Sequence, residues 1–170
     1  MRRAAVLVVL VVAIAVASNA GGSSTHVPSF VTLDGVGGVR PGMTIAQVER
    51  RFGIQLRLED LGTECMPAFF RSGTVEGYAI FIRGKLGSLW FEKGARTPRG
   101  IRIGSTLSEL RRAYRRVAVR KDHYVPTASN VFVQRARTPR WRLRFDVSPE
   151  GHVTRIAFGD NTVYLVEGCA

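Results

Sequence analysis

The sequence predicts an α+β fold of two fused repeats, each a capped helix followed by a three-stranded antiparallel β unit, with the helices packed on one face of the sheet. The first observation behind this prediction is a motif that occurs twice, over residues 38–53 and 100–115. The second is a strand–turn–strand pattern that follows each copy. We therefore expect a first repeat over residues 34–96 and a second over residues 97–170.

Each copy of the motif carries the signals that start a helix. Thr44 and Thr106 stand at the expected N-cap positions, and Gln47 and Glu109 follow three residues later. This spacing is that of a capping box, in which the two side chains satisfy each other's backbone N–H groups. Apolar residues then recur at helical spacing. They are Ile45, Val48 and Phe52 in the first copy and Leu107, Leu110 and Tyr114 in the second.

Alternating apolar and polar residues predict the strands. Two hairpins are expected, one turning at Gly84 and the other at Gly151. The acidic loop over residues 59–64 lacks the spacing of a calcium loop, so we interpret it as a solvated turn. The expected strands cover residues 54–58, 78–83, 86–92, 130–134, 141–147, 153–158 and 162–166.

The pattern from Gly42 through Thr44, Gln47 and Val48 to Phe52 and Gly53 resembles the helix signature of the small outer-membrane lipoprotein of the β-barrel assembly machinery. Tandem copies of such a unit also resemble the secreted β-lactamase inhibitor protein. Both resemblances imply helices packed on an antiparallel sheet. The second also implies that the free face of the sheet binds another protein.

The start of the chain is typical of a secretory signal peptide over residues 1–20, cut after Ala20 and followed by a leader over residues 21–33. A basic pair precedes the apolar run of residues 4–16. This run is shorter than the ~20 residues of a spanning helix, so we expect no transmembrane segment after cleavage, an uncleaved anchor being the alternative. The residue directly after the cleavage point is Gly21, not the cysteine to which a lipid would be attached. We therefore expect a secreted, periplasmic or cell-envelope protein without a lipid.

The chain is strongly basic, with a formal net charge of +12 at pH 7. Such a surplus favours an acidic protein or an anionic envelope polymer as the partner. Nucleic acid would also fit the charge, but export argues against it. Of the basic residues only Lys85, Lys93 and Lys121 are lysines, a bias that either genomic composition or selection for binding explains.

Cys65 and Cys169 are the two cysteines of the chain. In an exported protein they predict a disulfide bond. A redox pair is the alternative, but the Cys-x-x-Cys spacing is missing. A zinc site with His123 and His152 would lack the short-range ligand pair that such sites usually contain.

No constellation of catalytic residues emerges from the sequence, so we expect no enzyme activity and no cofactor. The nucleophile elbow Gly-x-Ser-x-Gly is missing. The glycine-rich stretch over residues 35–38 lacks the lysine of a phosphate-binding loop. We interpret it as a turn that leads into the first helix.

The face of the sheet turned away from the helices is the candidate binding surface. Arg142 and Arg144 alternate with apolar residues, and by the same parity Arg155 and Trp90 leave the core face. Arginine and tryptophan are enriched at protein interfaces. A basic stretch on the second helix is interpreted as a solvated side instead. It comprises Arg111, Arg112, Arg115 and Arg116, with Arg120 and Lys121 beyond.

These observations favour an exported, non-catalytic binding protein that recognises an acidic protein or envelope polymer through its sheet face. Inhibition of another protein is one form this would take, as the second resemblance implies. A cell-envelope assembly or maintenance factor is the alternative, implied by the first resemblance. A small secreted enzyme is a third class, which the sequence disfavours.

Overall fold

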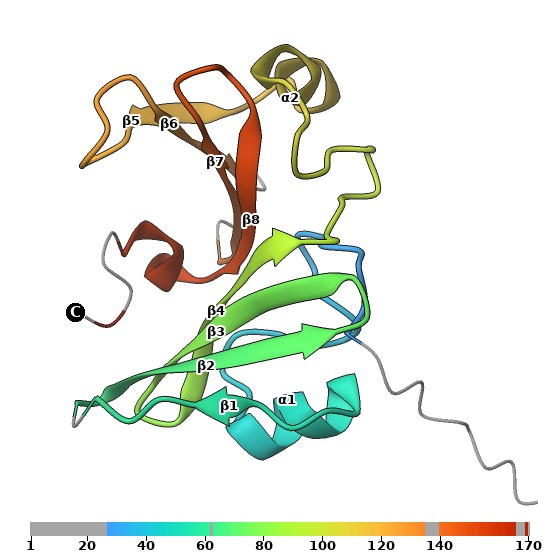
Figure 1. Cartoon of the computed structure of the whole chain (residues 1–170), viewed down its shortest axis with the longest axis vertical. Helices are drawn as coiled ribbons and strands as arrows, with labels where there is room; N and C mark the ends of the chain where they lie inside the picture. Colours follow the sequence, from blue (N-terminus) through green and yellow to red (C-terminus); the bar gives the residue numbers. More distant parts are fainter. Residues whose placement is uncertain (1–26, 62, 135–139, 166–168, 170) are drawn as a thin grey trace, which may run out of the picture.

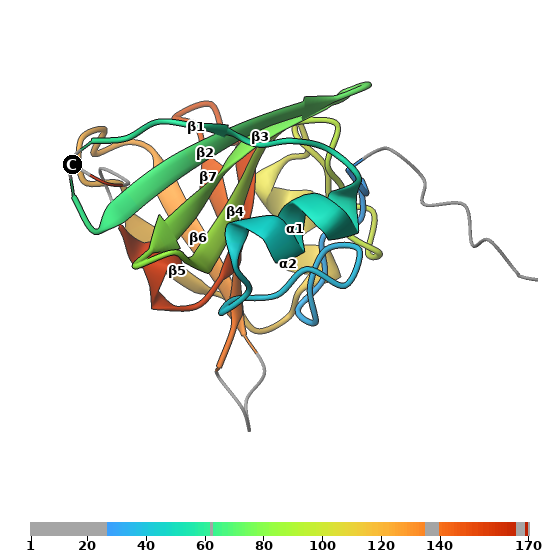
Figure 2. The ribbon, with the colours of Figure 1, turned by 90° about the horizontal axis from the view of Figure 1, so that it is seen from below.

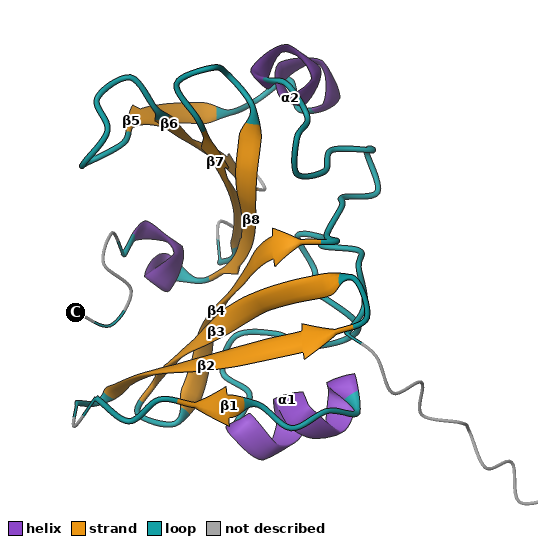
Figure 3. Ribbon diagram, viewed as in Figure 1, coloured by secondary structure: helices purple, strands orange, loops and turns teal. Residues whose placement is uncertain are grey.

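The structure, a computed structural model, describes residues 27–61, 63–134, 140–165 and 169. It contains one eight-stranded antiparallel sheet in the order β1-β2-β3-β4-β8-β7-β6-β5. The prediction of two fused repeats, each with one helix and three strands, is therefore wrong. The fold is mostly β, with two short helices at its periphery (Figure 3). The elements are α1 Ile45–Phe52, β1 Arg57–Leu58, β2 Cys65–Ser72, β3 Val75–Ile82, β4 Lys85–Lys93, α2 Leu107–Ala113, β5 Ala118–Lys121, β6 Ser129–Gln134, β7 Arg142–Val147, β8 Val153–Gly159 and the 3₁₀ helix η1 Asn161–Tyr164.

Both helices begin with the predicted capping boxes. The Thr44 N–H donates to Gln47 Oε1 at 2.8 Å, while Thr44 Oγ1 accepts from the Gln47 N–H at 3.3 Å. Thr106 and Glu109 make the same reciprocal pair, at 2.7 and 3.2 Å. Gly42 enters the first turn at φ 90°, a conformation that favours glycine.

The helices pack on one side of the sheet, which we call the outer face. Val48 and Phe52 of α1 are fully buried there, and the Phe52 ring meets Phe70 of β2 at 6.1 Å between centroids. Leu110 of α2 is also buried, and Tyr114 packs on Phe145 of β7 at 5.8 Å. Figure 2 shows α1 across the half of the sheet formed by β1–β4. The predicted apolar stripes are thus the core-facing stripes.

Three elements differ from the predicted ones. β2 and β5 are strands that the periodicity did not reveal, because Pro67 interrupts the first and all four residues of the second are exposed. The segment predicted as a last strand over residues 162–166 instead contains η1. Asp160 causes this turn, since its carboxylate accepts the Thr162 N–H at 2.9 Å.

The sheet bends strongly where its two halves meet at the pairing of β4 with β8 (Figure 1). We call the side opposite the helices the inner face. η1 lies against this face, and Val163 of η1 is fully buried among Ile80, Trp90 and Phe132. Residues 160–165 and 169, which we call the C-terminal segment, therefore lie over part of the surface that the sequence predicts to bind a partner.

Candidate functional site

The inner face holds the four side chains predicted to bind a partner. Trp90 comes from β4, Arg142 and Arg144 from β7, and Arg155 from β8. The predicted alternation is confirmed for β7, because Leu143 lies in the core of the outer face. Trp90 and Arg144 are each only 3% exposed, however. The structure thus brings the four residues together on one face, as the alternation predicts, but the sequence does not reveal that η1 lies against this face.

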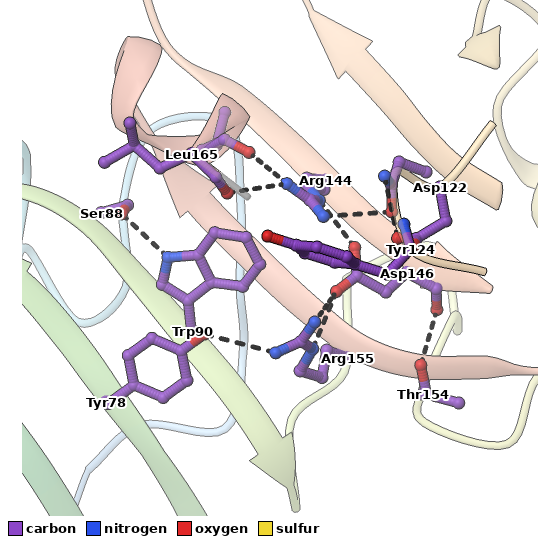
Figure 4. Close-up of polar contacts among 12 residues, drawn as sticks. Tyr78, Ser88, Trp90, Asp122, Tyr124, Arg144, Asp146, Thr154, Arg155 and Leu165 are labelled. Carbon is purple, nitrogen blue, oxygen red and sulfur yellow. Dashed lines mark hydrogen bonds and ion pairs between the residues drawn. The ribbon is translucent and has the colours of Figure 1, made fainter. Parts of the chain in front are cut away.

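The guanidinium group of Arg144 is the centre of a buried polar network (Figure 4). Its Nε donates to Asp146 Oδ1 at 2.6 Å, and its Nη2 donates to Asn130 Oδ1 at 3.1 Å. Its Nη1 donates to two backbone carbonyls of the C-terminal segment, those of Val163 at 2.9 Å and Leu165 at 3.3 Å. A buried guanidinium needs such partners, because its desolvation is otherwise very costly. Arg144 therefore fastens the C-terminal segment to the sheet.

Asp146 joins the second arginine of the network to the first. The Arg155 Nη2 lies 2.7 Å from Asp146 Oδ2, and its Nη1 lies 3.4 Å from the Tyr78 hydroxyl. Burial works to lower the pKa of Arg155, but Asp146, Tyr78 and Glu92 together outweigh it, so this pKa lies above its ordinary value. Burial also raises the pKa of Tyr78. The two arginines thus share one carboxylate.

Arginines and aromatic rings alternate along the inner face. The Arg120 guanidinium carbon lies 4.7 Å from the Tyr164 ring centroid and 5.5 Å from that of Phe132. That of Arg144 lies 5.8 Å from the Phe132 centroid and 4.9 Å from the Trp90 centroid. These distances are typical of cation–π contacts, each worth about 0.5–2 kcal/mol. The row runs from the edge strand β5 to the middle of the sheet.

A disulfide bond and the close packing of Thr162 on Gly87 hold the C-terminal segment against the sheet. The predicted bond between Cys65 and Cys169 is confirmed, with an S–S distance of 2.02 Å. It ties the segment to the first residue of β2, and it fits a secreted protein. At Gly87 of β4, an added Cβ would lie 2.4 Å from Thr162 Cγ2. Only glycine leaves room for Thr162 at this position.

The position of the C-terminal segment on the inner face determines the surroundings of the four residues predicted to bind a partner. η1 covers Trp90 and Arg144, and Asp146 engages Arg155. Arg142 lies at the margin, where it donates to Asn161 Oδ1 at 2.8 Å and lies over the Tyr164 ring at 5.0 Å. The four residues thus lie beneath or beside η1, and their role in binding a partner stays a prediction.

An open cavity of about 510 Å³ lies beside these four residues, at the end of the sheet formed by β5. We call it the edge cavity. Three arginines line it (Arg115, Arg116 and Arg120), together with the rings of Phe132 and Tyr164. None of its lining residues carries a carboxylate. Among the described residues, no ion pair engages these arginines. The edge cavity thus combines accessible positive charge with an aromatic floor.

Two of these arginines lie elsewhere than the sequence pattern predicts. The pattern places Arg115 and Arg116 on the solvated side of the second helix, but α2 ends at Ala113 and Tyr114 is already extended, with φ −125° and ψ 98°. Both arginines lie between α2 and β5 and face the edge cavity. The sequence does contain one signal for this basic cluster, the spacing of four basic residues around one short segment. They stand at positions 115, 116, 120 and 121. The prediction places Arg115 and Arg116 on the helix and Arg120 and Lys121 beyond it, because the pattern does not reveal β5.

Two negative findings apply to the described residues. In that part of the chain, no group of three or more His, Cys, Asp or Glu side chains is placed to hold a metal ion. Outside residues 1–26 and the other undescribed positions, no helix is long and apolar enough to cross a membrane. The predicted cleavage site after Ala20 lies among the residues that are not described.

Comparisons with known proteins give matches among solved structures but none among sequences. No protein-family model and no curated protein matches the sequence. Two matching structures are a cysteine-rich secretory protein from Staphylococcus aureus (12% identity, TM-score 0.46) and an extracellular protein containing an SCP domain from Bacillus anthracis (10% identity, TM-score 0.49). The matches cover 82% and 89% of this chain but 50% of each of those chains. This chain thus spans about half their length.

The resemblances suggested by the helix motif are wrong. The matching structures are described as a cysteine-rich secretory protein and an SCP-domain protein, not as a barrel-assembly lipoprotein or a β-lactamase inhibitor protein. The motif consists of a glycine turn and a capping box, both of which serve to start a helix. Such a short local device can occur in unrelated folds, which explains why it misled.

Proposed function

We propose that the protein is an exported, non-catalytic binding protein that takes an acidic partner into the edge cavity. The observation that carries this proposal is the set of three arginines, Arg115, Arg116 and Arg120, which line a cavity without a carboxylate. A cationic surface over a low-dielectric aromatic floor attracts anionic groups and strengthens their contacts. The partner is an acidic protein segment or an anionic envelope polymer.

The buried network beneath the cavity supports this proposal. Arg120 lies over the rings of Tyr164 and Phe132, so its charge is presented at the cavity in a fixed position. Tyr164 is in turn held by Arg142 and by the disulfide-tied segment to which it belongs. A preorganised cation loses less conformational entropy on binding than a mobile surface side chain does.

Charge reversal at the cavity tests the proposal. We expect the double variant Arg115→Glu and Arg116→Glu to bind poly-L-glutamate at least tenfold more weakly than the wild type, a loss of about 1.4 kcal/mol. Binding should also weaken as salt is added. Fluorescence anisotropy of labelled poly-L-glutamate and labelled polyphosphate measures both effects.

The control is the reversal of Arg50 and Arg51 at the end of α1. These residues are also exposed, and their reversal changes the net charge by the same amount, but they lie on the outer face. We expect less than a threefold loss for this control. Equal losses in the two double variants would show that the attraction belongs to the whole basic chain, and would overturn the edge cavity as the binding site.

A further inference from the structure

We infer that the acidic partner binds as an extended peptide segment that adds to β5 and lengthens the sheet by one strand. This inference rests on the proposed function and specifies the kind of partner and its geometry. β5 is the last strand in the sheet order and pairs with β6 on one side. Its other side has no neighbouring strand within the described residues, and all four of its residues are exposed. The edge cavity lies along this strand, because it is lined by Ala118 and Arg120.

The direction of the backbone groups of β5 follows from one hydrogen bond at its end. The Asp122 N–H donates to the Ala128 carbonyl at 3.1 Å, and these two residues continue the register of β5 with β6. Bonded and non-bonded pairs alternate along an antiparallel ladder. Arg120 and Ala118 therefore direct their backbone groups toward β6. Val119 and Lys121 direct theirs outward, to where an added strand would lie.

The side chains of β5 indicate which peptide would fit. Arg120 points to the inner face over Phe132, and residues alternate between the faces of a strand. Val119 therefore points to the opposite face, where it is 43% exposed. An added strand would place every second side chain beside Arg120 and the others beside Val119. The matching pattern is an alternation of acidic and apolar residues, a form of recognition in which an exposed sheet edge is extended.

The same charges argue against a second copy of this chain at the edge. Two β5 strands paired with each other would bring Arg120 and Lys121 of both copies together, and like charges across strands are destabilising. An anionic polymer without amide groups would satisfy the arginines but not the outward N–H and C=O groups of Val119 and Lys121. The acidic peptide is the occupant that matches both the charge and the backbone.

The test uses a blocked eight-residue peptide of alternating Glu and Val, with polyphosphate as a probe that lacks amides. We expect Val119→Pro to bind the peptide at least tenfold more weakly, because proline removes the outward N–H while remaining compatible with an edge strand. Polyphosphate binding should change less than threefold. The matched control, Val119→Thr, keeps the N–H and should lose less than threefold with either probe.

A second measurement leaves the protein unchanged, so that it remains decisive if Val119→Pro unfolds. The second probe is a peptide of the same charge that is N-methylated at two adjacent central residues. It cannot donate a backbone N–H hydrogen bond from either edge of its strand at that point. We expect it to bind at least tenfold more weakly than its parent. Equal binding of the two peptides would overturn strand addition and leave the proposed function standing. Undiminished binding of the parent peptide and of polyphosphate by the Arg115→Glu, Arg116→Glu variant would overturn the proposed function itself.

Discussion

Asp146 offers the sharpest test of what holds the inner face together. Its side chain is 9% exposed and that of Arg144 is 3% exposed, and their closest atoms lie 2.6 Å apart. Replacing Asp146 with Asn keeps the shape but removes the carboxylate charge that Arg144 and Arg155 share. Removing one partner of a buried ion pair costs about 3–5 kcal/mol, because an uncompensated charge stays buried. We expect the free energy of unfolding to fall by this amount.

Glu76 provides a matched control, since it too is a carboxylate between two basic side chains. Arg71 lies 2.7 Å from it and Lys93 lies 3.1 Å from it, but these side chains are 72% and 68% exposed. Exposed ion pairs contribute little because water screens them, so Glu76→Gln should lower the free energy of unfolding far less than Asp146→Asn does. Urea denaturation of the oxidised proteins measures both values. Losses that agree within 1 kcal/mol would refute the view that burial makes the Asp146 network structural.

Two further predictions concern the disulfide and the second helix cap. Replacing Cys65 and Cys169 by serine should lower the stability by about 4–5 kcal/mol in the chain-entropy model, since the bond links residues 104 apart; a loss below about 1 kcal/mol in urea unfolding would contradict this. The Thr106 N–H holds the pKa of Glu109 below its ordinary value of 4.5. The stabilisation by the ionised Glu109 carboxylate is therefore complete above pH 4.5 and is lost as the pH falls through the lowered pKa. The Glu109→Gln variant should lose that part of the pH dependence in thermal melts between pH 2 and 6, and identical profiles would count against the cap.

The local parts of the fold could be predicted because their signals lie within a few residues. Thr44 and Thr106 mark their helices through contacts that span three positions, and both capping boxes are present. The pairing of Cys65 with Cys169 followed from the presence of two cysteines and from the predicted signal peptide. The hairpins at Gly84 and Gly151 also follow from adjacent sequence.

The sheet as a whole could not be predicted in this way, because its central pairing joins β4 to β8 and depends on no local pattern. The covering of the inner face was missed for a related reason. Val163 looked like a strand residue, and its burial against Trp90 depends on a turn that Asp160 caps. The edge cavity was missed because β5 is short and all four of its residues are exposed.

The position of Trp90 gives the protein a built-in optical reporter. The chain has two tryptophans, and they lie on opposite faces. Trp141 packs edge-on against Phe158, while Trp90 is stacked on Tyr78 at an interplanar angle of 5° and donates to Ser88 Oγ at 2.9 Å. In a Trp141→Phe variant, the remaining indole emission would come from beneath the C-terminal segment alone. Its wavelength and its access to a dissolved quencher would then register any departure of that segment from the sheet, without an attached dye.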